Sequence, residues 1–373
     1  MSMMGCATPE GTARYGERFR DSAASDHFRH AQNLWLSSIG IGTYLGNWDE
    51  TTDRRYIDAV ARTIELGANV VDTAINYRFQ RSERSIGQAL RRLISEEAKF
   101  ARDELVICTK GGYLPFDGAP PTDARRYVED TFVHKGVANF SDIVAGSHCM
   151  TPAYLQNQLN ESLANLGLSC IDVYYIHNPE TQLQEVSHEE FDDRLQIAFE
   201  RLEQNVAEGK IKHYGVATWN GFRVPTNAPG YHSLERMVGL AREVGGRDHN
   251  FRFIQLPFNL AMPEALVTYN QTLQGTRVTV LEAAHTLGLT VVASASLLQG
   301  KVAFGIPEAI RGPLGSLSTE AQTAIQFVRS TPGINTALIG MSRRAHVEEN
   351  LQLTRVPPVS LEDYGRLFEQ GAK

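Results

Sequence analysis

The sequence is poor in cysteine and has no long apolar run. Its four cysteines are Cys6, Cys108, Cys149 and Cys170, and no two of them are spaced as Cys-x-x-Cys. We therefore expect neither a disulfide framework nor a structural zinc site, and a reducing compartment fits this usage. No run of about eighteen apolar residues occurs, and residues 1–30 lack the apolar core of a signal peptide. These absences predict a cytoplasmic protein without a membrane span.

The chain also lacks an excess of positive charge. Its formal net charge is −7, with a pI near 5.9, so it has no basic field that would attract nucleic acid or an anionic membrane. We expect neither as a partner. A length of 373 residues with 42% hydrophobic content is enough to bury a large core, either as one barrel with insertions or as two smaller domains.

From residue 38 onward, short apolar runs that end in a polar residue alternate with longer stretches that carry apolar residues at helical spacing. This alternation is typical of a parallel sheet covered by helices, an α/β fold. The candidate strands are 38–43, 69–72, 105–110, 172–177, 212–218, 253–255, 290–294 and 336–340. Eight strands alternating with helices predict a (β/α)8 TIM barrel.

Helix signals fill the intervals between these strands. Thr151-Pro152 is an N-cap followed by a first-turn proline, and Gly167 stands where that helix would end. Ser187 and Glu190 have the spacing of a capping box. Further helices are predicted at 232–244, 276–287 and 318–331.

Residues 111–150 interrupt the alternation. This stretch after the third strand has glycine and proline pairs and several aromatics without clear periodicity, and it is far longer than an ordinary loop. We interpret it as an insertion in a single barrel domain at 34–373, which follows an N-terminal extension at 1–33. Neither an internal repeat nor a low-complexity linker favours a second domain.

Polar residues end four of the predicted strands, at Asp72, Lys110, His177 and Gln255. The carboxyl ends of barrel strands form one face, where active sites are placed. Each residue alone has an ordinary explanation: a helix cap, a solvated lysine or a core histidine. Three ionisable groups brought to one mouth must instead pair or shift their pKa values, so we expect the set to form a site.

Tyr77 follows Asp72 by five residues, in the loop expected over that mouth. A free phenol titrates near ~10, and a neighbouring ammonium stabilises the phenolate and lowers its pKa. We predict that Lys110 supplies this ammonium and that Asp72 holds it charged and oriented. His177 would then donate a hydrogen bond to a substrate carbonyl oxygen.

At these positions the sequence resembles the aldo-keto reductase superfamily, over roughly residues 34–353. The resemblance rests on Val71-Asp72-Thr73-Ala74 with Tyr77, on Thr109-Lys110, on Asp172-Val173-Tyr174-Tyr175-Ile176-His177, and on Gly340 with Glu349-Asn350-Leu351. It implies an NAD(P)(H)-dependent oxidoreductase that acts on CH–OH donors (EC 1.1.1). Such an enzyme interconverts an aldehyde or ketone with an alcohol by hydride transfer, with Tyr77 as the proton donor.

The resemblance further implies a dinucleotide extended across the barrel mouth without a Rossmann fold. The residues implied to bind it are Gly42, Thr43, Asp72, Thr218, Gln255, Ser294, Gly340, Ser342, Arg343, Arg344, Glu349 and Asn350. Some relatives have an arginine for the 2′-phosphate where this chain has His346, which leaves Arg343 or Arg344 for that group. NADP(H) is therefore favoured, with NAD(H) possible.

This chain departs from the family pattern at two positions that would contact the nicotinamide. Ala217-Thr218 replaces the usual Ser-Asn, and Ser294 stands where an aromatic usually stacks. Stacking must therefore come from another residue. Tyr44 and Trp48 in the first loop are candidate substrate contacts, and so is Tyr113 at the start of the insertion.

Other interpretations remain open from the sequence. The same barrel could be a non-catalytic NADP(H)-binding regulatory or redox-sensing subunit, or an aldolase or isomerase that uses Lys110 as a Schiff-base amine. His148-Cys149 has no second ligand pair, so we expect loop packing and no metal. The expected partner is a small carbonyl or alcohol substrate. We expect the protein to be a monomer or a small homo-oligomer.

Overall fold

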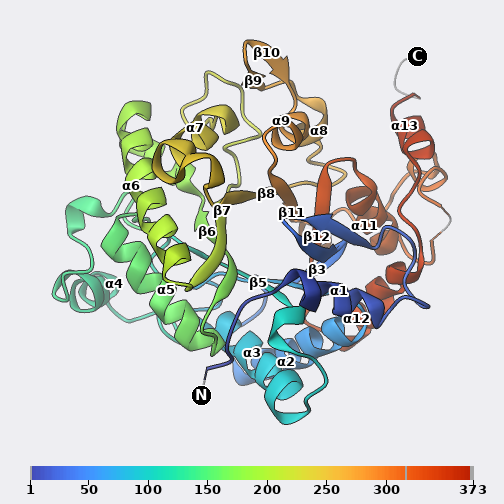
Figure 1. Cartoon of the computed structure of the whole chain (residues 1–373), viewed down its shortest axis with the longest axis horizontal. Coiled ribbons are helices and arrows are strands. Elements are labelled where there is room, and N and C mark those ends of the chain that lie inside the picture. Colours follow the sequence, from blue (N-terminus) through green and yellow to red (C-terminus); the bar gives the residue numbers. More distant parts are fainter. Residues whose placement is uncertain (1, 316, 370–373) are drawn as a thin grey trace.

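The computed structural model describes residues 2–315 and 317–369, and its centre is a closed barrel of eight parallel strands (Figure 1). Around the barrel the strands follow the order β11, β12, β3, β4, β5, β6, β7, β8. They are β3 (Ile39–Gly42), β4 (Val70–Asp72), β5 (Val106–Gly111), β6 (Ile171–His177), β7 (Ile211–Ala217), β8 (Phe251–Pro257), β11 (Thr290–Ser294) and β12 (Ile334–Gly340). The predicted (β/α)8 fold is confirmed, and every barrel strand overlaps the run predicted for it.

The register brings the polar strand ends together. Gly42 lies opposite Asp72 in the β3–β4 pair, and His177 lies opposite Ala217 in the β6–β7 pair. Ala217 in turn lies opposite Gln255 in the β7–β8 pair. The carboxyl ends of neighbouring strands therefore meet on one face of the barrel.

Helices cover the outside of the barrel (Figure 1). The main ones are α2 (Glu50–Glu65), α3 (Arg81–Leu90), α5 (Pro152–Leu166), α6 (His188–Ala207), α7 (Leu234–Gly245), α9 (Val280–Thr286), α11 (Glu320–Ser330), α12 (Arg344–Asn350) and α13 (Leu361–Glu369). The expected caps are present: Gly167 ends α5 in the left-handed conformation, and the Ser187 hydroxyl accepts the Glu190 N–H at 3.2 Å at the start of α6.

One helix begins later than predicted. Residues 276–278 form β10 (Thr276–Val278), which pairs with β9 (Gln271–Leu273) in a small hairpin. The helix starts only after Thr279, whose side chain forms a reciprocal capping box with Glu282. The expected start at 276 is therefore wrong, because the hairpin takes up the first residues of the helical pattern.

The N-terminal residues cover the other end of the barrel. Helix α1 (Pro9–Glu17) is followed by a hairpin of β1 (Phe28–Ala31) and β2 (Leu34–Ser37). Leu34 and Leu36 pack with Val70, Val173 and other inward-facing strand residues in a buried cluster. Because side chains fill this end, an opening into the barrel must lie at the opposite, carboxyl end.

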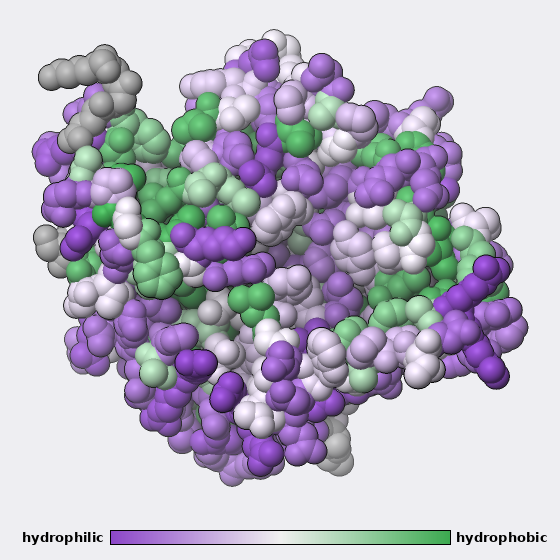
Figure 2. Space-filling view, turned by 180° about the vertical axis from the view of Figure 1, so that it is seen from behind, coloured by the Kyte–Doolittle hydropathy of each residue, from purple (hydrophilic) through white to green (hydrophobic). Residues whose placement is uncertain are grey.

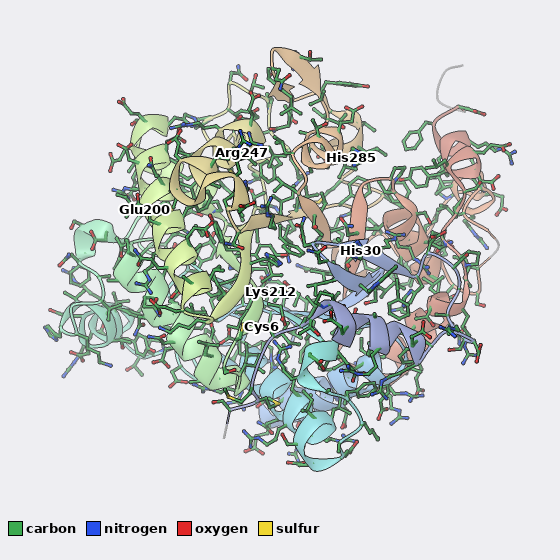
Figure 3. The ribbon with its side chains drawn as sticks, in the orientation of Figure 1. Cys6, His30, Glu200, Lys212, Arg247 and His285 are labelled. Atoms are coloured by element: carbon green, nitrogen blue, oxygen red, sulfur yellow. A yellow bond between two sulfur atoms is a disulfide. The ribbon has the colours of Figure 1, made fainter. Side chains whose placement is uncertain are left out.

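A disulfide fastens the first residues to this covered end. Cys6 and Cys170 are bonded, with their Cα atoms 5.4 Å apart, and the Lys212 ammonium donates to the Ala7 carbonyl at 2.8 Å (Figure 3). The expectation of no disulfide is therefore wrong for this pair. The two cysteines are 164 residues apart, and only the fold brings them together.

The insertion at 111–150 folds against itself. It contains α4 (Ala124–Val128), a π-helix η3 (Glu129–Val133) and a single 3₁₀ turn η4 (Phe140–Asp142). Val128, Phe132 and Cys149 form a small buried cluster with Tyr154 of α5. Among the described residues, no helix is both long and apolar enough to cross a membrane.

Candidate active site

A cavity of about 1000 Å³ opens at the carboxyl ends of the strands. Its walls include the strand-end residues Asp72, His177 and Gln255. Seen from the side opposite to Figure 1, the molecule is hollowed near its centre, with hydrophobic side chains on both sides of the hollow (Figure 2). This volume is at the upper end of the range for small-molecule and cofactor sites.

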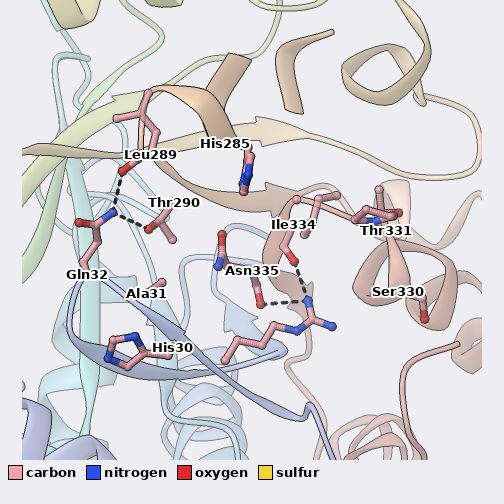
Figure 4. Close-up of a pocket in the computed structure, with 14 residues that line it drawn as sticks. His30, Ala31, Gln32, His285, Leu289, Thr290, Ser330, Thr331, Ile334 and Asn335 are labelled. Atoms are coloured by element: carbon pink, nitrogen blue, oxygen red, sulfur yellow. Dashed lines mark hydrogen bonds between the residues drawn. The ribbon is translucent and has the colours of Figure 1, made fainter. Parts of the chain in front are cut away.

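A smaller hollow of about 430 Å³ lies at the covered end, between the N-terminal hairpin and β11 and β12 (Figure 4). Its polar side chains are used to fasten the hairpin. Arg29 donates to the carbonyl of Ile334 at 2.6 Å, and the Gln32 amide donates to the carbonyl of Gly288 at 2.9 Å and to the Thr290 hydroxyl at 3.1 Å. This hollow is therefore part of the barrel closure, and the larger cavity is the candidate site.

A buried ion pair lies at the wall of the larger cavity, where Asp72 belongs to the lining and Lys110 is buried behind it. The Lys110 ammonium donates to Asp72 Oδ2 and to the Thr73 carbonyl, both at 2.6 Å, and Gln255 donates to Asp72 Oδ1 at 2.8 Å. Burial disfavours the ammonium, but the Asp72 carboxylate and the Tyr77 phenol outweigh this effect and raise the pKa of Lys110. Lys110 therefore stays charged.

Tyr77 lies directly over this lysine, whose ammonium is 5.0 Å from the centre of the phenol ring. Burial raises the pKa of Tyr77 above its ordinary value, while the ammonium acts in the opposite direction. The expected net lowering of this pKa is wrong, because desolvation of the phenolate outweighs the lysine charge. The phenol therefore stays protonated. The Lys110 ammonium keeps the pKa of Tyr77 lower than burial alone would make it.

His177 lies beside Tyr77, with 5.7 Å between the ring centres, and its Nδ1 has no hydrogen-bond partner among the described residues. Burial, followed by the nearby Lys110 charge, lowers the pKa of His177 well below its ordinary value, so the imidazole is neutral. His148 Nε2 hydrogen-bonds the His177 carbonyl at 2.8 Å, and Gln182 bonds the other nitrogen of His148 at 2.8 Å. His148 thus supports the strand end on which His177 is carried.

Most of the residues implied to bind a dinucleotide line the cavity. These are Gly42, Thr43, Asp72, Thr218, Gln255, Ser294, Gly340, Ser342, Glu349 and Asn350. The buried Asn350 Oδ1 has no partner within the described chain, so this wall offers an acceptor to a donor group such as an adenine amine. The unpaired acceptor and the cavity size fit a dinucleotide. Arg343 and Arg344 are exposed and lie beyond the lining.

Of the three aromatic residues expected to contact the substrate, two line the cavity and one does not. Tyr44 and Tyr113 line the cavity, where the Tyr44 ring is 5.0 Å from that of Tyr77 and the Tyr113 ring is 5.1 Å from that of His177. Trp48 is outside the lining, because its ring packs on Phe79 at 5.2 Å. The structure therefore brings two of the three aromatics next to Tyr77 and His177.

Sequence reasoning missed Trp219 and the carboxylate that fixes its backbone. Trp219 lines the cavity just beyond the end of β7. Glu180 Oε1 accepts hydrogen bonds from the Thr218 hydroxyl at 2.8 Å and from the N–H groups of Trp219 at 2.8 Å and Asn220 at 2.9 Å. The polar Glu180 follows His177 closely in the sequence, but only the folded loops show what it holds.

Burial acts to raise the pKa of Glu180, but the opposing contacts prevail. His232, whose Nε2 is 3.6 Å from Glu180 Oε2, and the backbone and hydroxyl donors lower the pKa of this carboxyl to about 2. Glu180 is therefore ionised at neutral pH and joins the loop after β6 to the loop after β7.

Comparisons with known proteins agree with this architecture. Residues 38–228 match the model of the Aldo/keto reductase family. The chain is 28% identical over 150 residues to the NADH-specific methylglyoxal reductase of Escherichia coli K12, a match that spans 39% of each chain. It is 23% identical to the L-glyceraldehyde 3-phosphate reductase of the same bacterium, over 94% of this chain and 90% of that protein.

The fold also matches solved structures. An aldo/keto reductase from Klebsiella pneumoniae in complex with NADP and acetate superposes with a TM-score of 0.62, at 20% identity, over 93% of this chain and 95% of that one. The family match covers more than half of the chain and includes three of the four strand-end residues. The chain belongs to the aldo/keto reductase family.

Proposed function

We propose that the protein is an NAD(P)(H)-dependent oxidoreductase that interconverts an aldehyde or ketone with the corresponding alcohol. The observation that carries this proposal is the protonated Tyr77 phenol between the buried Lys110–Asp72 pair and the neutral His177, at the cavity wall. A bound nicotinamide would supply the hydride to the carbonyl carbon. The same site would run in reverse with an alcohol and the oxidised cofactor.

The chain's own residues have separate roles in this proposal. The Tyr77 hydroxyl donates a hydrogen bond, and then its proton, to the carbonyl oxygen. The neutral His177 imidazole donates a second hydrogen bond that orients the same oxygen. The phenolate left by proton transfer is stabilised by the Lys110 ammonium, whose charge is held by Asp72.

We propose NADP(H) as the preferred cofactor, with NAD(H) as a possible one. A solved neighbour contains NADP, and one relative is named as NADH-specific. Arg343 and Arg344 are proposed to contact the 2′-phosphate from the edge of the cavity. Arg344 pairs at 2.9 Å with Glu348, but both side chains are exposed, and an exposed pair of this kind stabilises by only about 0–1 kcal/mol, so it does not prevent that contact.

Replacing Tyr77 with Phe tests the proposal. We expect Tyr77→Phe to lower kcat by roughly 10²–10⁴-fold, because it removes the general acid, while dinucleotide affinity is retained. Turnover is followed by nicotinamide absorbance with a panel of aldehydes and ketones, and cofactor affinity by calorimetry. Tyr231→Phe is the matched control, since its hydroxyl donates to the Asn270 carbonyl outside the cavity. Unchanged turnover in Tyr77→Phe would remove this residue from the mechanism.

Turnover and binding assays, together with borohydride trapping, test the two other interpretations. A regulatory subunit would bind the dinucleotide without turnover of any substrate, and the complete set of Asp72, Tyr77, Lys110 and His177 does not favour it. In an aldolase, Lys110 would form an imine with the carbonyl substrate, and borohydride would reduce this imine to a stable covalent bond between substrate and lysine. That reaction requires an unprotonated amine, whereas the buried ion pair with Asp72 holds this lysine charged.

A further inference from the structure

Three consecutive residues after Tyr77 form a turn in which every φ angle is positive. Arg78, Phe79 and Gln80 have φ values of 50°, 58° and 70°, and none of them is a glycine. A Cβ atom makes this left-handed conformation costly, and residues other than glycine adopt it mostly one at a time. A run of three therefore persists only where surrounding contacts hold it. Tyr77, whose ring lies over the Lys110 ammonium, is bonded directly to the first residue of this turn.

Arg78 ties this turn to the segment that follows β3. Its Nε donates to the Asn47 carbonyl at 2.8 Å, and its Nη2 bonds Asp53 Oδ1. Its guanidinium lies 5.1 Å from the centre of the Tyr56 ring. Asp53 and Tyr56 belong to α2, and Asn47 lies in the loop before it. Because the Arg78 side chain is only 1% exposed, solvent and salt screen its ion pair less than they screen a surface pair.

The insertion after β5 contacts the other side of the turn. The Phe79 carbonyl accepts the Gly118 N–H at 2.9 Å, and the Gln80 amide donates to the Phe116 carbonyl at 3.2 Å. Both are bonds between neutral groups, whereas Arg78 pairs with a carboxylate. Charge-assisted bonds are stronger than neutral ones, so we expect Arg78 to hold the turn more firmly than the insertion does.

We propose that Arg78 is a positioning residue, which locks the turn at 78–80 and thereby keeps the Tyr77 hydroxyl in place for proton transfer. This inference rests on the proposed carbonyl reduction with Tyr77 as the proton donor. Arg78 lies outside the cavity lining, so it acts on the reaction through the backbone that carries Tyr77. Such an effect is large, because a misplacement of about 1 Å at a reacting group costs about 10²-fold in rate.

Replacing Arg78 with Met removes the guanidinium and keeps a side chain that fills part of the same space. We expect kcat to fall by about 10²-fold. KM and dinucleotide affinity should change little, because the walls that bind these molecules stay in place. Steady-state kinetics and calorimetry measure the three quantities. Arg78→Gly is the second variant: glycine adopts a φ of 50° without penalty, so this variant should fold even if the Met variant does not, and its kcat should fall as far.

Arg81→Met is the matched control. Arg81 also pairs with Asp53, but it is the first residue of α3 and lies outside the turn, so its loss should leave kcat little changed. A loss of kcat in Arg81→Met as large as in Arg78→Met would assign the effect to the Asp53 carboxylate and overturn the proposal. A parental kcat in a folded Arg78 variant, or an equal loss of kcat and dinucleotide affinity, would overturn it as well.

Hydrogen exchange tests the lock independently of turnover. The Tyr77 N–H donates to the Ala74 carbonyl at 3.0 Å and the Arg81 N–H to the Arg78 carbonyl at 3.2 Å, so both amides are protected while the turn is held. By mass spectrometry, the segment 77–81 should exchange at least about tenfold faster in Arg78→Met than in the parent or in Arg81→Met. Unchanged exchange would overturn the inference whatever the turnover. If the parent reduces no carbonyl compound but exchange rises as expected, the reductase proposal fails and the lock stands.

Discussion

Replacing Lys110 should lower both the free energy of unfolding and kcat, and a second substitution at Asp72 should restore only the first. Asp72 and Lys110 are 4% and 1% exposed and 2.6 Å apart, so Lys110→Met leaves a buried carboxylate whose remaining side-chain donor is Gln255. Losing one member of a buried ion pair costs about 3–5 kcal/mol of unfolding free energy, because the other charge stays desolvated. The double variant Asp72→Asn/Lys110→Met removes both charges and should regain most of that loss.

Activity should not return with stability. Without the ammonium, nothing opposes burial, to which the Asp72 carboxylate adds in the single variant, so the pKa of Tyr77 rises further and the phenolate left by proton transfer is less stable. We expect kcat to fall by at least about 10²-fold in the single and the double variant alike. Urea denaturation measures stability, and steady-state kinetics measures turnover. A single variant as stable as the parent, or a double variant with restored turnover, would refute this reasoning.

Two further predictions concern residues next to the cavity. The pKa of Glu180 is lowered to about 2 from an ordinary value of about 4.5, so its ionised form stabilises the fold above pH 4.5, and that contribution is lost as the pH falls toward 2. The difference in unfolding free energy between the parent and Glu180→Gln should therefore be constant above about pH 5 and shrink below it; a difference independent of pH would contradict the assignment. Replacing Arg343 and Arg344 with Ala should weaken NADP(H) binding, measured by calorimetry, more than NAD(H) binding. Equal losses for the two cofactors would exclude a 2′-phosphate contact.

The fold was predictable because its signals are local. Several barrel strands are apolar runs that stop at a polar residue, as at Asp72 and His177, and helix α5 is bounded by Pro152 and Gly167. The convergence of the strand ends then followed from the topology of a parallel barrel.

The remaining features depend on distances that a sequence does not contain. The pKa direction of Tyr77 depends on how completely the fold buries the phenol, and the bond between Cys6 and Cys170 depends on where the N-terminal segment crosses the barrel. Glu180 has no recognisable spacing to Trp219, because the two lie on loops that follow different strands. These features are tertiary and arise only when distant segments of the chain meet in the fold.

The disulfide between Cys6 and Cys170 also affects the order in which parts of the protein can fold during synthesis. Met3 donates to the Gly167 carbonyl at 2.8 Å, so the first residues of the chain dock beside a segment that is synthesised much later. During translation the docking site for Met3 and Cys6 is complete only once Gly167 and Cys170 have left the ribosome, whereas Thr8 docks on Asp103, which is made earlier. The bond between Cys6 and Cys170 can therefore form only after β3, β4 and β5 have been synthesised. It can form before the later strands close the barrel.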